Sequence, residues 1–183
     1  TFNSKSNFTF KINQKFKVKN FDIKSIINVE NLKINNFLGS NSSFPQMKDD
    51  ITFENHKIEL NYNKNKIDII GSGNVLFQDN LDKVNYKITN KNDKFIFDIN
   101  LNIIENLFVV DFLSYEKDKN SILDLNIKGM FEGKDLFFDE ITLFEKENIL
   151  TIKNLKFSEN YKISGVENIK FDYDDKFKRK NKL

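Results

Sequence analysis

The sequence predicts an all-β protein built as one long antiparallel meander. Apolar residues recur at every second position in many segments, and these segments follow one another about every 8–12 residues. The clearest case is residues 95–103, where five apolar side chains alternate mostly with Asp and Asn. Because successive side chains of a strand point to opposite faces, this segment has one apolar face and one mainly polar face. Such strands without intervening helices favour a meander over a βαβ fold.

The same alternation predicts strands along most of the chain. In order, the strand candidates are residues 8–12, 16–18, 21–23, 27–29, 32–34, 51–53, 58–62, 67–77, 84–88, 95–103, 123–133, 136–138, 141–143, 150–152, 155–157 and 169–173. The polar breaks at 63–66 and 90–93 are typical of hairpin turns. Gly71 and Gly73 fall on the apolar face of their strand, which indicates a bend or a close approach of another group to the backbone.

Three segments depart from this rhythm. Residues 38–50 include Gly39 and the only proline, Pro45, and predict a long loop. Apolar residues near 104–116 fall at helical spacing, which predicts a short helix, although Val109 and Val110 would suit a strand equally well. Residues 176–183 form a basic run that we interpret as a tail or linker. The whole of residues 1–183 is expected to form a single β-rich segment of a larger protein.

Composition and charge exclude several function classes. Charged residues make up 31% of the chain, but the net charge is only +2 and the lysines are dispersed. Where lysines alternate with apolar residues, as at 15–19, the strand period puts Phe16 and the lysines on opposite faces, so we expect no nucleic acid partner. The absence of cysteine excludes disulfides and thiolate metal sites.

No pattern of residues points to catalysis or to a bound metal. His56 is the only histidine, and residues 54–57 around it are interpreted as an exposed turn. Residues 172–175 resemble the start of a calcium-binding loop, but the required Gly is missing and the twelfth position is Leu183 instead of Glu. We therefore expect neither an enzyme nor a cofactor.

The extent of the apolar face raises the question of what covers it. About a dozen strands spaced by about 4.8 Å give a sheet of roughly 55–60 Å, too long to leave one apolar face in water. Three arrangements would cover this face. The sheet could fold over a second layer, be covered by a partner, or curl into a groove that shelters apolar ligands. A face built of Phe, Ile and Leu, with few polar groups, suits acyl chains.

A resemblance to a known family supports the third arrangement, a sheet curled into a groove. Residues 127–141, which contain Gly129-Met130-Phe131-Glu132-Gly133, and residues 150–157, with an Asn-Leu-x-apolar step, resemble the AsmA-like proteins of diderm bacteria. This group includes the YhdP and TamB types, and the resemblance is best over residues 123–173. It implies a periplasmic protein, anchored to the inner membrane by a segment outside this chain, whose curled β-sheet carries phospholipid towards the outer membrane. The expected partners are phospholipid and the inner and outer membranes or their proteins.

Two hypotheses for the function follow. The first is a segment of an envelope-spanning lipid-transfer protein with an apolar β-groove. Its lipid-binding residues are expected to be Ile67, Ile69, Val75, Phe77, Val84, Tyr86, Ile88, Phe95, Phe97, Ile99, Leu101, Ile103, Leu123, Leu125 and Ile127. The alternative is a structural or adhesive β-sandwich module in which the same apolar face is a self-packed core.

Overall fold

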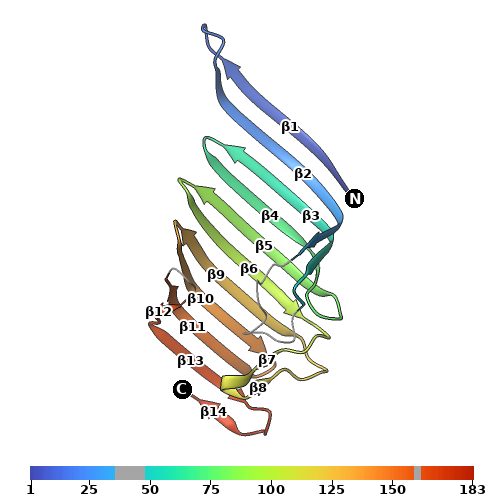
Figure 1. The fold of residues 1–183 in the computed structure, drawn as a ribbon, viewed down its shortest axis with the longest axis vertical. Helices are drawn as coiled ribbons and strands as arrows, with labels where there is room; N and C mark the ends of the chain where they lie inside the picture. The colour runs from blue at the N-terminus through green and yellow to red at the C-terminus, as the bar shows by residue number, and fades with distance from the viewer. Residues whose placement is uncertain (36–47, 159–161) are drawn as a thin grey trace.

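A single large antiparallel sheet forms nearly the whole protein, which confirms the all-β meander (Figure 1). The computed structural model describes residues 1–35, 48–158 and 162–183. The strands of the large sheet are β1 (Phe2–Ile12), β2 (Val18–Ile34), β3 (Ile51–Asn63), β4 (Lys66–Leu76), β5 (Asp82–Lys91), β6 (Lys94–Ile103), β9 (Leu123–Glu132), β10 (Asp135–Glu145), β11 (Asn148–Phe157), β12 (Ile163–Gly165), β13 (Asn168–Asp174) and β14 (Lys180–Lys182). They pair in chain order, except that β12 and β13 both pair with β11 and that β9 follows β6.

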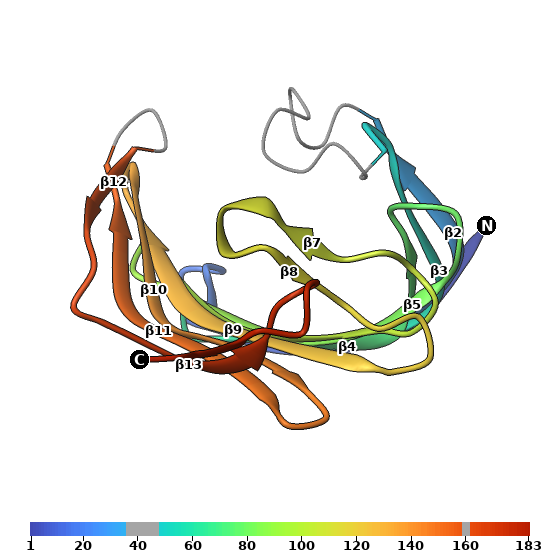
Figure 2. The same ribbon diagram turned by 90° about the horizontal axis from the view of Figure 1, so that it is seen from below.

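The sheet is bent into a trough, and a small insertion lies inside it (Figure 2). The insertion joins β6 to β9 and contains the two-stranded sheet of β7 (Val109–Val110) and β8 (Tyr115–Glu116). The edge strands β1 and β14 are not paired with each other, so the sheet is open.

Cross-strand register sorts the side chains onto two faces. Residues directly opposite each other in neighbouring strands share a face, and Ile99 of β6 is opposite Tyr86 of β5 and Ile127 of β9. The row continues across the concave face as Ile27, Ile58, Gly71, Tyr86, Ile99, Ile127, Ile141, Ile152 and Ile169. The adjacent row on the convex face is polar and consists of Asn85, Asn100, Asn126, Thr142 and Thr151. The concave face is therefore apolar and the convex face mainly polar.

The two predicted hairpin turns are confirmed. Lys64 and Asn65 have positive φ angles of 45° and 63° between β3 and β4. Asn92 and Asp93, with φ angles of 52° and 60°, make the equivalent turn between β5 and β6. Two consecutive residues with positive φ match the right-handed twist of the flanking strands, as in type I′ turns.

Several strands are longer than the sequence predicts. In each, a bulge lets the strand continue past a point where the apolar residues shift from even to odd positions or the reverse. Residues 51–53 and 58–62 belong to one strand, β3, in which Asn55 has a φ of 52°. Residues 150–152 and 155–157 merge in the same way into β11 around Asn154, also at φ 52°. Asparagine tolerates the left-handed region better than most residues, so one extra residue is absorbed and both halves keep their apolar side chains on one face.

The three irregular segments have different outcomes. The short helix predicted near 104–116 is present as one 3-10 turn, Asp111–Leu113, between β7 and β8, whereas the β-branched Val109 and Val110 pair as a strand. Most of the loop predicted at 38–50 lies outside the described residues. Residues 176–183 are not a free tail, since β14 pairs with β13 and Lys180 Nζ lies 2.6 Å from Asp172 Oδ1. In the described part of the chain, no helix is long and apolar enough to cross a bilayer.

The most deeply buried residues lie where the insertion covers the sheet. Ile103, Leu123, Leu143, Tyr115 of β8 and Tyr173 of β13 belong to one buried cluster, which continues along the groove through Ile51, Val75, Phe77 and Val84. The Tyr115 and Tyr173 rings meet edge to face with centroids 5.8 Å apart. This covered region is the core of the protein, whereas most of the concave face elsewhere is only half-buried.

Truncation of this core is expected to destabilise the fold strongly. Leu123 has 0% exposure, so Leu123→Ala should lower the free energy of unfolding by about 2–5 kcal/mol. Its neighbour Ile122 is 54% exposed, so Ile122→Ala is the matched control and should change stability by about 0.5 kcal/mol or less. Urea denaturation followed by circular dichroism measures both, and equal effects would contradict the placement of the core.

Candidate functional site

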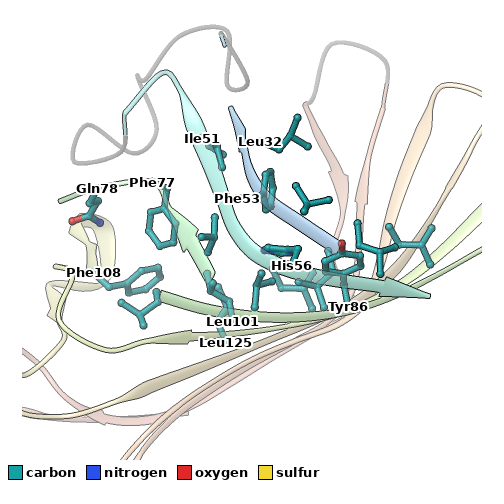
Figure 3. A pocket seen from close by; sticks show the side chains of 18 residues that line it. Leu32, Ile51, Phe53, His56, Phe77, Gln78, Tyr86, Leu101, Phe108 and Leu125 are labelled. Atoms are coloured by element: carbon teal, nitrogen blue, oxygen red, sulfur yellow. The ribbon is translucent and has the colours of Figure 1, made fainter. Parts of the chain in front are cut away.

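An apolar groove of about 610 Å³ lies on the concave face (Figure 3). Fifteen of its eighteen lining side chains are pure hydrocarbon, and none is charged: Val29, Leu32, Ile51, Phe53, Ile58, Val75, Phe77, Val84, Ile88, Ile99, Leu101, Ile103, Phe108, Leu125 and Ile127. The other three, His56, Gln78 and Tyr86, each add a polar group. The volume falls within the range of about 300–1,000 Å³ that is typical of small-molecule pockets.

Ten of the fifteen residues predicted to bind lipid line this groove. They are Val75, Phe77, Val84, Tyr86, Ile88, Ile99, Leu101, Ile103, Leu125 and Ile127. Ile67, Ile69, Phe95 and Phe97 are in rows on the same face but closer to the hairpin turns, outside the groove. Leu123 is not at the groove surface, because the insertion buries it completely.

Sequence reasoning missed eight lining residues. Val29, Leu32, Ile51, Phe53 and Ile58 carry the same alternation as the predicted ones, so the periodicity signal was present. In these strands the apolar alternation shifts by one residue partway along, so the sequence does not show that both halves lie on the same face of the sheet. Gln78 and Phe108 lie outside the alternating strands and give no local signal.

The eighth missed residue, His56, corrects the prediction of an exposed turn. Residues 54–57 form a bulge within β3, and His56 is only 3% exposed. Its Nε2 donates a hydrogen bond of 2.9 Å to the Asn74 carbonyl oxygen. The bulge turns the imidazole onto the concave face, where its ring lies edge-on to Phe53 at 5.2 Å between centroids. The imidazole is thus a fixed part of the groove wall.

The two glycines on the apolar face allow a close approach, as predicted. A Cβ atom on Gly71 would overlap the ring of Tyr86, and one on Gly73 would overlap the imidazole of His56. The missing side chains on β4 therefore make room for these two rings. Tyr86 and His56 lie side by side, with ring centroids 6.0 Å apart and planes inclined by 27° (Figure 3).

The insertion between β6 and β9 bounds the groove on one side and is held by buried polar contacts. Phe108 lines the groove, and the adjacent Leu107 carbonyl accepts a 2.6 Å hydrogen bond from Gln78 Nε2. Asp82, which is fully buried, accepts 2.7 Å bonds from the Ile104 backbone N–H and from Asn106 Nδ2. Burial raises the pKa of Asp82, because these donors only partly offset the cost of removing its charge from water.

Glu145 of β10 anchors the far end of the insertion. Its carboxylate accepts a 2.6 Å bond from the Tyr115 hydroxyl, a 2.7 Å bond from the Asp118 backbone N–H, and a further bond from Ser121 Oγ. Burial opposes its ionisation, but these donors outweigh burial and hold the pKa of Glu145 below its usual value. Burial, together with the Glu145 carboxylate, raises the pKa of Tyr115, so this hydroxyl remains a neutral donor.

Comparisons with known proteins give no match from which the role of the groove could be read. No family model matches the chain, and neither a curated protein nor a solved structure matches it. Within residues 1–35, 48–158 and 162–183, no cluster of three or more His, Asp or Glu side chains is arranged to hold a metal ion. The resemblance to AsmA-like proteins therefore remains a prediction, and the lining of the groove carries the functional argument.

Removal of the Glu145 charge is expected to loosen the insertion in a pH-dependent way. Glu145→Gln should lower the free energy of unfolding by about 1.5–3 kcal/mol at pH 7, because charge-assisted hydrogen bonds to buried donors are lost. Because the folded protein depresses this pKa, the stabilisation is fully present above the ordinary value of 4.5. It is lost as the pH falls through the lower pKa of the folded state.

Denaturant unfolding of the wild type and Glu145→Gln from pH 7 down to pH 3 tests this expectation. The difference in stability should shrink steadily below about pH 4.5. Glu147→Gln is the control, since Glu147 is exposed two residues away. A difference that stays constant with pH would contradict the role of the carboxylate.

Proposed function

We propose that this chain shelters phospholipid acyl chains in its concave groove and works as a segment of an envelope-spanning lipid-transfer protein. The observation that carries the proposal is the lining of the groove, in which fifteen of eighteen side chains are hydrocarbon and none is charged. Each methylene group that leaves water for such a lining contributes about 0.8 kcal/mol, so a long chain binds without polar contacts.

The continuity of the apolar rows favours transfer over storage. The row that includes Ile99 extends beyond the groove on both sides, from Ile27 in β2 to Ile169 in β13. A hydrocarbon chain that slides perpendicular to the strands therefore meets similar side chains at each step. The periplasmic location and the anchor in the inner membrane rest on the resemblance to AsmA-like proteins and are part of the same proposal.

The alternative, a structural or adhesive β-sandwich, requires a second sheet packed on the apolar face. The described strands instead form one large sheet and the small β7–β8 sheet, which lies over only part of the trough (Figure 2). The groove residues are left without a second layer of the kind that a sandwich provides. This arrangement supports the lipid-binding proposal over the sandwich.

Co-purification of lipid tests the proposal. The wild-type protein, purified from a bacterial host without detergent, should carry phospholipid that mass spectrometry detects after extraction. Ile99→Asp should reduce the bound lipid at least about tenfold, because an unpaired carboxylate in an apolar groove disfavours the hydrocarbon chain. Circular dichroism establishes that the variant is folded.

The convex face of the same strand offers a matched control. Ile96 of β6 is 49% exposed and does not line the groove, so Ile96→Asp should retain the lipid. A monodisperse wild-type protein free of lipid, which also fails to bind phospholipid from vesicles, would contradict the proposed function. Equal lipid loss in both variants would contradict the groove as the place of binding.

A further inference from the structure

The hydroxyl of Tyr86 is the one side-chain hydroxyl in the groove lining, and it lacks a hydrogen-bond partner within the described chain. The other described tyrosines all have one. Tyr62 donates to Asn65 Oδ1 at 3.2 Å, Tyr115 to Glu145 Oε2 at 2.6 Å, and Tyr173 to the Leu113 carbonyl at 2.7 Å. Tyr86 is half-buried, and its hydroxyl is not one of the buried atoms that lack a partner, so it is available to donate to an acceptor that enters the groove.

Contacts with two neighbouring strands fix the position of the Tyr86 hydroxyl. Tyr86 in β5 is directly opposite Gly71 in β4, and its ring occupies the space that a side chain at position 71 would fill. The stacked imidazole of His56 holds the ring from the side, and the Asn74 carbonyl fixes that imidazole. Three neighbouring strands thus cooperate to keep one polar group at a defined point in an apolar groove.

The acceptor must be uncharged. No Lys or Arg side chain lines the groove, so a carboxylate beside Tyr86 would lose its hydration without gaining a counter-charge. Burial raises the pKa of Tyr86, which keeps the hydroxyl protonated and able to donate. A neutral carbonyl oxygen accepts such a bond at little cost, and the bond gains strength where water does not compete.

We propose that Tyr86 Oη donates a hydrogen bond to the ester carbonyl oxygen of an acyl chain lodged in the groove. This inference rests on the proposed function and makes it more specific. The groove then recognises the junction between an acyl chain and its ester group, and Tyr86 sets the position of the chain along the groove. A hydrocarbon without an ester group also binds, but no hydrogen bond fixes its position along the groove.

The test uses methyl laurate labelled with ¹³C at its carbonyl carbon, together with dodecane and laurate. When bound to the wild-type protein, the carbonyl resonance should lie downfield of its position in a hydrocarbon solvent, which is the direction produced by a donated hydrogen bond. In Tyr86→Phe this shift should be absent, and the affinity for methyl laurate should fall about three- to tenfold. The affinity for dodecane should stay unchanged, because the phenyl ring still fills the groove wall.

Two further variants separate the hydroxyl from general effects on the fold. Tyr62→Phe makes the same chemical change outside the groove and should alter neither the shift nor the affinity. Gly71→Ala keeps the Tyr86 hydroxyl but displaces the ring, and should lose the downfield shift as Tyr86→Phe does. Both variants are checked for folding by circular dichroism.

The outcomes distinguish this inference from the function on which it rests. If the wild type binds neither methyl laurate nor dodecane, the proposed function fails. If it binds both and Tyr86→Phe leaves the carbonyl shift and affinity unchanged, the groove remains a lipid site and the role of Tyr86 is overturned. Tighter binding of laurate than of methyl laurate at pH 8 would overturn the uncharged acceptor.

Discussion

Cross-strand register is the constraint on which the rest of the structure depends. With side chains alternating every residue, a slip of one position in any strand pair would move its apolar set to the convex face. Within the sheet, neighbouring strands keep the isoleucine row that includes Ile99 in line over strands β2 to β13, apart from Gly71 and Tyr86 in β4 and β5. The groove, the polar convex face and the burial of the insertion all follow from this alignment.

The bulges show how that alignment survives an irregular sequence. The apolar pattern of β3 changes phase between Phe53 and Ile58, yet both side chains line the groove. The extra residue is accommodated at Asn55, in the left-handed region. The same bulge brings His56 onto the concave face, so the irregularity that preserves the apolar lining also introduces one of its few polar groups. A bulge also bends its strand, which contributes to the curvature of the trough.

The alternation of apolar residues along the chain predicted the strands, the hairpin turns and much of the groove lining. The alternation at 95–103 and the turns at 63–66 and 90–93 led to the correct strands and hairpins, and ten groove residues followed from the shared face. The bulges were interpreted as strand breaks, because a phase change and a strand end look alike in sequence. The burial of His56 and the placement of Phe108 depend on contacts between segments distant along the chain, which no local periodicity encodes.

The order of strands in the large sheet almost repeats their order along the chain. Each strand therefore gains stability chiefly from its two neighbours, as in repeat proteins, where cooperativity spreads from one unit to the next. Fraying is expected to begin at the margins, where every residue of β1 is exposed. The strands that form the groove lie from β2 to β9, away from the C-terminal margin and largely inside the array. Local opening confined to the terminal strands is therefore expected to leave the pairing of the groove strands intact.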